Sequence, residues 1–199
     1  MSRLNELISS LCPSGVEFKT IGSLVNYERP DRYIVNDTNY DDEYGTPVLT
    51  AGKSFILGYT YETENIYQAS KDEPVIIFDD FTGAFKWVDF PFKVKSSAMK
   101  ILKSDDITLL RYIFYIMGRI NFTSSEHKRL WISIYSKFTI PLPPLEVQQE
   151  IVNILDKFTK LEAELEAELE AELEAELEAR KKQYEFYRDK LLSFENIGS

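Results

Sequence analysis

The residues best suited to chemistry in this sequence are basic and aromatic side chains that alternate within short, loop-like stretches. Four stretches show the pattern: YERPDRY, TAGKSFILGYTY, FDDFTGAFKWVDF and SSEHKRLW. Lysine and arginine suit phosphates and guanine edges, whereas threonine, serine and tyrosine suit base edges or sugars. Any single stretch also fits the end of an ordinary amphipathic strand, so it is the four together that favour nucleic-acid binding. The candidate DNA-binding residues are Arg29, Arg32, Lys53, Tyr59, Thr82, Lys86, Lys128 and Arg129.

A phosphate-binding loop is the first catalytic motif that the sequence suggests and then excludes. Gly52, Lys53 and Ser54 resemble the end of such a loop. The motif requires another glycine five residues before Gly52, and that position is Pro47, which has no backbone N–H to offer a phosphate. Nucleotide binding through this segment is therefore not expected.

A metal-dependent nuclease pattern is the second catalytic possibility. Pro30-Asp31 together with Glu126 and Lys128 imitates a carboxylate and lysine arrangement that holds Mg²⁺, although nearly a hundred residues separate its parts. His127 is the one histidine, and it fits a polar surface residue better than a general base. Asp79-Asp80 follows an apolar run, which is typical of a turn at a strand end. We expect no covalent chemistry and no metal or cofactor bound by this chain.

The net charge of −10 comes almost entirely from one segment. Residues 161–179 hold nine glutamates and no basic residue, so 24 of the 33 acidic side chains lie elsewhere, against 23 basic ones. The rest of the chain is electrostatically balanced, and its charge does not oppose a nucleic-acid partner. One cysteine, no apolar run of 18 residues and no signal-like N-terminus indicate a soluble cytoplasmic protein.

The elements that must position the candidate residues form an α+β (mixed α/β) arrangement. Leu4, Leu7, Ile8 and Leu11 at helical spacing predict an N-terminal helix that Pro13 and Gly15 end, and short β-rich runs with Gly, Asp and Asn breaks follow from about Phe18 to Trp87. SDDITLLRYIFYIMG predicts a helix capped by Ser104 or Asp105 and ended near Gly118. LWISIYSKFTIPLPPL predicts a strand that runs into a proline-stiffened corner. We expect a target-binding domain over 1–144, a long helix over 145–194 and a tail over 195–199.

The long helix carries an apolar seam that no small domain can cover. Its central segment repeats LEAE four times from residue 161 and ends in Arg180. The whole helix would be about 70 Å long, and each four-residue step rotates the leucine stripe by about 40° around its axis. The repeat block is either a solvated spacer helix or a segment whose length sets the distance between two functional domains. The rod must pack on a partner. The seam residues are Ile151, Ile154, Phe158, Leu161, Leu165, Leu169, Leu173, Leu177, Tyr184, Tyr187 and Leu191.

Several stretches resemble the DNA-specificity subunits of type I restriction–modification systems, and the resemblance covers nearly the whole chain. The stretches are LCPSGVEFKTIGSLV, TPVLTAGKSFILGYT, IIFDDFTGAFKWVDFPFKVKSSAMKIL, HKRLWISIYSKFTIPLPPLEVQQEIVNILDKF and RKKQYEFYRDKLLSF. Members of that family usually carry two target-recognition domains, each followed by a helical region, and the two helices pack antiparallel. This sequence holds one domain and one helical region, so it resembles half of such a subunit.

The resemblance implies a non-catalytic subunit that binds double-stranded DNA. It implies pairing with a second copy or with a different half-subunit, and methylation and restriction subunits that supply S-adenosylmethionine, ATP and Mg²⁺ chemistry. Two copies related by a twofold axis would read an inverted repeat, and the LEAE repeat would set the gap between its halves. The alternatives are a stand-alone Mg²⁺ nuclease built on Glu126 and Lys128 and a coiled-coil adaptor without DNA affinity.

Overall fold

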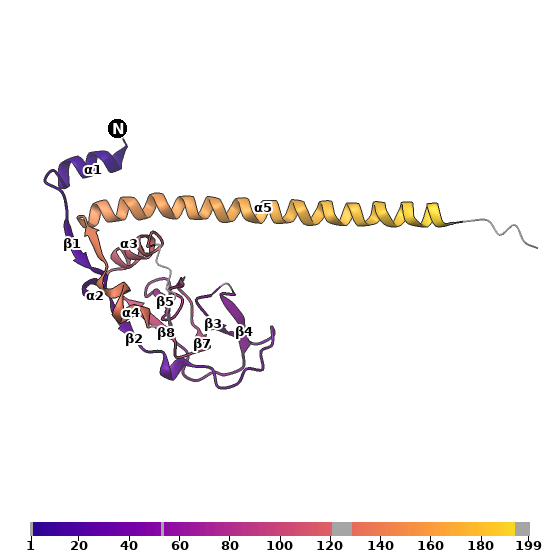
Figure 1. Cartoon of the computed structure of the whole chain (residues 1–199), viewed down its shortest axis with the longest axis horizontal. Helices are drawn as coiled ribbons and strands as arrows, with labels where there is room; N and C mark the ends of the chain where they lie inside the picture. The colour runs from indigo at the N-terminus through magenta and orange to yellow at the C-terminus, as the bar shows by residue number, and fades with distance from the viewer. Residues whose placement is uncertain (1, 53, 121–128, 194–199) are drawn as a thin grey trace, which may run out of the picture. The chain divides into compact units, whose positions relative to one another are not determined.

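The computed structural model describes residues 2–52, 54–120 and 129–193. The chain divides into two compact units, Met1–Val152 and Asn153–Ser199. The first unit mixes strands and short helices, and the second consists of the greater part of one long helix (Figure 1). The expected α+β class, with a β-rich domain followed by a long helix, is confirmed.

A four-stranded antiparallel sheet forms the centre of the first unit. Its order is β2 (Asn26–Glu28), β8 (Met99–Lys103), β5 (Val75–Asp79) and β6 (Phe85–Val88). Side chains alternate between the faces of a strand, so an apolar run such as VIIF implies cover on both faces. β5 is buried over four of its five residues and feeds two separate core clusters.

The two clusters lie on opposite faces of this sheet. On one face Ile76 and Phe78 pack with α3 (Ile107–Met117) and α4 (Leu130–Ser133). On the other face Val75 and Ile77 pack with a smaller sheet, whose order is β4 (Ile56–Thr60), β3 (Thr46–Leu49) and β7 (Lys93–Val94). The central sheet is therefore a rigid layer from which the loops at its ends project.

A second pair of strands joins the beginning of the domain to its end. β1 (Glu17–Thr20) pairs antiparallel with β9 (Thr139–Leu142). The remaining elements are α1 (Arg3–Leu11), α2 (Ile21–Leu24) and the 3₁₀ turns η1 (Asp31–Tyr33) and η2 (Tyr135–Lys137). The predicted N-terminal helix is confirmed, and Ser2 caps it by accepting a hydrogen bond from the Asn5 N–H.

Two details of the sequence prediction are wrong. The cap of α3 is Asp106, whose side chain accepts from the Leu109 N–H, and Ser104 instead accepts from the Asp106 N–H. The stretch from Leu130 is not a strand: it forms α4, a 3₁₀ turn, and only then β9. The β-branched residues there favour a strand locally, but buried Leu130, Trp131 and Tyr135 join the core through helical turns.

The last helix, α5, runs from Leu145 to Leu192 over 48 residues, which confirms the predicted long helix. Val147, Gln148 and Val152 in its first turns are buried, and the boundary between the two units falls after Val152. Ile151 and Ile154 are half-buried, whereas every predicted seam residue from Phe158 to Leu191 is exposed. Within the described ranges, no helix combines the length and apolarity needed to cross a membrane.

Candidate nucleic-acid interface

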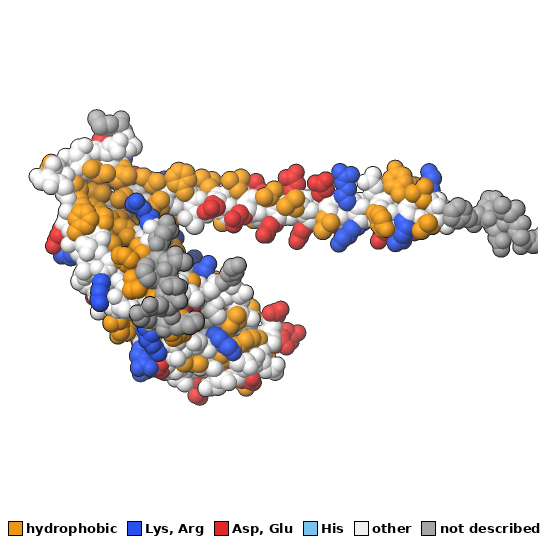
Figure 2. Space-filling view, in the orientation of Figure 1, with side chains coloured by type: hydrophobic (Ala, Val, Ile, Leu, Met, Phe, Trp, Pro, Cys, Tyr) orange, Lys and Arg blue, Asp and Glu red, His pale blue; other side chains and the backbone are white. Residues whose placement is uncertain are grey.

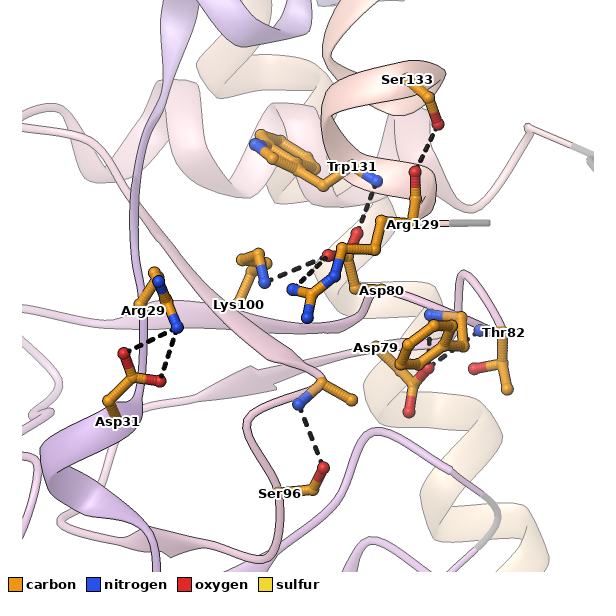
Figure 3. Close-up of polar contacts among 12 residues, drawn as sticks. Arg29, Asp31, Asp79, Asp80, Thr82, Ser96, Lys100, Arg129, Trp131 and Ser133 are labelled. Carbon is orange, nitrogen blue, oxygen red and sulfur yellow. Dashed lines mark hydrogen bonds and ion pairs between the residues drawn. The ribbon is translucent and has the colours of Figure 1, made fainter. Parts of the chain in front are cut away.

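One end of the central sheet gathers several of the predicted DNA-binding residues. β2 and β5 both pair antiparallel with β8, so the residues that follow β2 and β5 lie beside those that precede β8. We call this the hairpin end, defined by residues 29–32, 79–84 and 95–98 together with Arg129. Arg29 and Thr82 lie here by strand register, Arg32 follows in η1, and Arg129 is held here by Asp80 (Figure 3).

The β5–β6 hairpin supplies the tip of this end. The Asp79 carboxylate accepts hydrogen bonds from the Phe81 N–H at 2.9 Å and the Thr82 N–H at 2.8 Å, which confirms the predicted turn (Figure 3). Gly83 has a φ of +74°, and a Cβ there would lie 2.7 Å from the Tyr135 hydroxyl. Only glycine combines that left-handed conformation with so close an approach. The turn is therefore fixed by its own hydrogen bonds and by the packing behind it.

Asp80 anchors the hairpin to α4. It is fully buried; its carboxylate accepts from the Trp131 N–H at 2.7 Å, and its carbonyl accepts from the Leu130 N–H at 2.7 Å. Lys100, 3% exposed, places Nζ 3.1 Å from Asp80 Oδ2 as an ion pair, although the angles are not those of a hydrogen bond. Arg129 Nη1 lies 3.7 Å from the same oxygen (Figure 3). The buried Asp80 carboxylate thus lies next to the buried ammonium group of Lys100 and the exposed guanidinium group of Arg129.

The cations at the hairpin end remain accessible to solvent. The Arg129 side chain is 55% exposed, and its guanidinium lies 5.9 Å from the centre of the Phe81 ring. The Arg29 side chain is 65% exposed and pairs with Asp31 at 3.0 Å. An exposed ion pair contributes about 0–1 kcal/mol, so a phosphate can replace the carboxylate at low cost. The Arg32 guanidinium lies 5.9 Å from the Tyr33 ring centre.

The remaining candidate residues are not gathered there. Lys86, on β6, lies opposite Ile77 in the strand register, away from the tip of the hairpin. Tyr59 belongs to β4 and lines a separate groove of about 570 Å³ with Pro47 and Phe90. Lys53 and Lys128 lie outside the described residues. The structure therefore brings together four of the eight candidates and leaves their role in DNA binding as a prediction.

A second buried ion pair supports the smaller sheet. Lys93, 1% exposed, lies 2.7 Å from Glu62 Oε2, and Glu62 Oε1 accepts from the N–H groups of Asn36 and Asp37. Burial by itself raises the pKa of Glu62, but the bonds to Lys93, Asp37 and Asn36 outweigh it, so its pKa lies below the ordinary 4.5. The Glu62 carboxylate thus joins the loop that precedes β3, the residues after β4 and Lys93 of β7.

Sequence reasoning missed the buried charges Asp80, Lys100 and Lys93 and the partly buried Glu62. Lysines within the apolar strand runs MKIL and FKV were the available signal, because a charge at an inward-facing position implies a buried partner. Which acid serves each lysine is not readable from the sequence. Asp80 lies twenty residues from Lys100, and Glu62 lies two residues beyond the end of β4, whereas Lys93 is on β7.

The predicted absence of a phosphate-binding loop agrees with the geometry. Residues 50–55 join β3 to antiparallel β4, whereas the motif joins a strand to a helix, and the Gly52 N–H is already bonded to Thr50 Oγ1. Among the described residues, no group of three or more His, Cys, Asp or Glu side chains is placed to hold a metal ion. Glu126, His127 and Lys128, on which the nuclease alternative depends, lie outside the described residues.

The second unit presents a different kind of surface. Hydrophobic side chains recur along α5 in Figure 2, and from Phe158 onward those of the seam are more than half exposed. Phe158, Leu161, Leu165 and Leu169 line a shallow apolar groove along the helix. The exposed seam residues, with their exposed fractions, are Phe158 65%, Leu161 54%, Leu165 65%, Leu169 57%, Leu173 56%, Leu177 56%, Tyr184 67%, Tyr187 51% and Leu191 70%.

Comparison with known proteins gives consistent matches. Residues 13–175 match a family model described as type I restriction modification DNA specificity domain. A type I restriction enzyme specificity subunit of Escherichia coli is 52% identical over 206 aligned positions, which cover 98% of this chain and 49% of that protein. A putative specificity subunit of Haemophilus influenzae is 34% identical, covering 73% of this chain and 38% of that protein.

Solved structures show the same fold. The S subunit of a type I restriction–modification system from M. genitalium superposes with a TM-score of 0.58 at 16% identity, covering 82% of this chain and 45% of that one. A chain from a structural study of type I system assembly also gives 0.58, at 18% identity, covering 86% of this chain and 45% of that one. The chain thus spans about half the length of the curated relatives and structures that it matches.

Proposed function

Since this chain belongs to the family of type I restriction modification DNA specificity domains, we propose that it binds double-stranded DNA and reads one half of a split target site. Specificity subunits of these systems recognise DNA and are not catalytic. The chain therefore supplies recognition, and other subunits carry out the reactions on DNA.

The observation that carries the proposal is the hairpin end of the central sheet. Arg29 and Arg129 are exposed there, and Arg129 lies on a framework of buried hydrogen bonds and one buried ion pair. Arginine binds phosphates and guanine edges, and a rigid support lowers the entropy lost when it does so. The hydroxyl of Thr82, which is exposed, adds a donor and acceptor suited to a base edge.

The exposed apolar stripe of α5 supports pairing with a second copy. A helix whose seam residues are more than half exposed gains free energy when another helix covers them, about 25 cal/mol for each Å² of apolar surface buried. A twofold axis makes such an interface self-complementary, and antiparallel helices place one recognition domain at each end. Two identical domains then read an inverted repeat. A different half-subunit in place of the second copy would instead produce two unlike half-sites.

The LEAE repeat sets the separation of the two half-sites in this arrangement. Each unit adds four residues, or about 6 Å of helix, which is nearly two base-pair rises of 3.4 Å. Opposed glutamates would repel, so leucine and alanine line the interface while glutamate faces solvent or a basic surface of a methylation subunit.

The reactions belong to partner subunits in the cytoplasm. Methylation subunits dock on the helices and supply S-adenosylmethionine chemistry, and restriction subunits supply ATP-driven and Mg²⁺-dependent cleavage.

The decisive experiment is genome-wide methylation mapping in cells that express this chain with its methylation subunits. We expect an inverted repeat interrupted by unspecified bases. Deleting residues 165–168 should shorten the gap and leave both half-sites unchanged. A matched control keeps the length and replaces Glu166 and Glu168 with alanine, and its gap should equal that of the wild type.

Two results would oppose the proposal. Changed half-site bases with an unchanged gap in the deletion variant would refute the spacing role of the repeat. No retarded band in a gel-shift titration, with the methylation subunits present, would favour an adaptor without DNA affinity.

A further inference from the structure

Phe81 is an exposed aromatic side chain at a rigid tip. Its ring is 42% exposed, although Phe78, Phe85 and Trp87 of the same two strands pack into or against a core cluster. Its backbone N–H donates to the Asp79 carboxylate at 2.9 Å, which holds the backbone of the turn from which the ring projects. An apolar ring kept in solvent by a fixed turn costs free energy, which is offset if the ring has a binding partner.

Asp80, the next residue back, lies on the opposite side of the hairpin backbone. It is fully buried and joins the hairpin to the N-terminus of α4 through the N–H groups of Leu130 and Trp131. Through its 3.7 Å approach to Arg129, it also keeps the guanidinium beside the Phe81 ring, 5.9 Å from the ring centre. The Phe81 ring and the Arg129 guanidinium therefore lie side by side at the hairpin end.

We propose that Phe81 contacts a base of the half-site, that Arg129 binds the phosphate beside that base, and that Asp80 positions Arg129. The assignment rests on the proposed DNA-binding function and deepens it to particular residues. Aromatic and aliphatic side chains read thymine through its methyl group or wedge between base steps, whereas arginine neutralises phosphates. Asp80 touches no DNA in this scheme and acts only through Arg129.

The hairpin framework explains why this ring can read sequence. Thr82 is bound at its N–H by Asp79 and at its hydroxyl by the Ala84 N–H, and Gly83 fits against Tyr135. A side chain that discriminates between bases must take the same position at every half-site, and side chains on well-packed elements do so better than side chains on flexible loops. Arg29, across the hairpin end, lacks such a buried support and is expected to contribute mainly to phosphate attraction.

The test is selection of binding sites from a random DNA library by the full chain with its methylation subunits. We expect Phe81→Ala to lose preference at one base position in each half-site. Its affinity for the wild-type site should fall roughly 5- to 100-fold, which is the range for one specific base contact. The slope of log K against log salt should stay unchanged, because no charge is removed. Phe18→Ala is the control, since Phe18 is 59% exposed on β1.

Arg129→Gln tests the phosphate contact. Affinity should fall equally for all sequences, and the salt slope should become shallower by about one unit for each bound domain. Lys71→Gln is the matched control, because Lys71 is exposed and precedes β5, at the opposite end of the strand from the hairpin. Its salt slope should match the wild type.

Asp80→Asn tests the positioning role. The amide oxygen still accepts from the Trp131 N–H, but buried Lys100 loses its anionic partner, so we expect a folded chain with a lowered melting temperature, checked by thermal unfolding. If Asp80 acts through Arg129, the salt slope of Asp80→Asn matches that of Arg129→Gln, and the double variant adds no further change in slope. A salt slope at its wild-type value in Asp80→Asn, whatever the fall in melting temperature, would mean a merely structural role and would overturn the assignment.

The outcomes separate this inference from the proposed function. If the wild type selects no sequence, the DNA-reading function itself fails. If the wild type selects a split site while Phe81→Ala and Arg129→Gln behave like the Phe18 and Lys71 controls, the function stands and this assignment is wrong. Should Phe81→Ala alone change base preference, the phosphate part is overturned and the base contact is kept.

Discussion

The recognition domain buries its large apolar residues, whereas the long helix exposes most of its own. In the domain, Ile76, Phe78 and Ile77 are fully buried within two clusters that the domain makes alone. In the helix, Leu165 and Leu169 are 65% and 57% exposed. The domain's stability therefore comes from its own packing, whereas the helix leaves apolar area that only another molecule can cover.

The charged residues differ between the two regions in the same way. The domain encloses Lys93 and Lys100, each paired with one acid, so these two enclosed charges are fixed in place. The helix exposes nine glutamates in residues 161–179, and ion pairs such as Lys160–Glu164, Arg180–Glu176 and Lys182–Glu178 join exposed side chains four residues apart. Changes in the domain should therefore alter folding, and changes in the helix should alter association.

Trp131→Ala should produce the largest effect on folding. The side chain is 1% exposed, and its ring lies 5.5 Å from that of Phe78. Truncation leaves a cavity in the core, and we expect a loss of about 4–5 kcal/mol in the free energy of unfolding. Chemical denaturation measures it. Ile132→Ala, where the side chain is 57% exposed, is the control and should change stability by less than about 0.5 kcal/mol. Equal losses for the two variants would contradict the described core.

Glu62→Gln should rank second. The change leaves Lys93 buried with its charge uncompensated, although the Glu64 carbonyl still accepts from its ammonium group at 3.0 Å. We expect a loss of about 2–3 kcal/mol, below the full cost of breaking a buried ion pair because the amide keeps part of the hydrogen bonding. Glu64→Gln, which changes an exposed neighbour, is the matched control and should be near neutral.

The same carboxyl gives a pH dependence of defined sign. The pKa of Glu62 lies below its ordinary value of 4.5 in the folded domain. A group of this kind stabilises the fold fully above its unfolded pKa, and the contribution is lost as the pH falls through the folded value. Stability of the wild type should therefore fall more steeply below about pH 4.5 than stability of Glu62→Gln. Parallel curves for the two proteins in that range would show that this carboxyl carries no such linkage.

Leu165→Ala should leave the folding of the domain unchanged and weaken self-association. Truncating the leucine side chain reduces the apolar area that the proposed dimer buries, which should weaken its association free energy by about 1–2 kcal/mol for each chain. Sedimentation at several protein concentrations measures the shift toward monomer. Ala167→Ser, about 200° further around the helix, is the control and should not shift it. A wild type that stays monomeric at micromolar concentration with its methylation subunits would remove the basis for pairing.

The contrast also explains which features were predictable from the sequence. Helices α1, α3 and α5 follow from local periodicity and end signals, and they were predicted within a few residues. α4 was mistaken for a strand because Asp80, the residue that accepts from its first N–H groups, lies fifty residues earlier in the chain. Local patterns predict local elements, but they do not reveal an acceptor that tertiary folding brings from elsewhere.

The candidate site was predictable to a similar extent. Loop composition pointed to Arg29, Thr82 and Arg129, which share the hairpin end. Lys86 and Tyr59 look alike in sequence but lie elsewhere, because strand register decides which loop residues meet. Phe81 gave no signal among so many aromatic residues, since only the structure shows which rings are buried and which are exposed.

Glu170→Gln should have the smallest effect, and salt concentration makes it visible. Glu166 and Glu174 lie four residues to either side, and each like-charge pair destabilises a helix by roughly a few tenths of a kcal/mol. At low salt we expect a small gain in helix content by circular dichroism, fading near 1 M salt as the Debye length shrinks to about 3 Å. The buried Lys93–Glu62 pair is shielded from that screening, so the stability lost in Glu62→Gln should change little with salt. If the effects of Glu170→Gln and Glu62→Gln changed equally with salt, the charges of the domain would be no better shielded from solvent than those of the helix, which would contradict the comparison of the two regions.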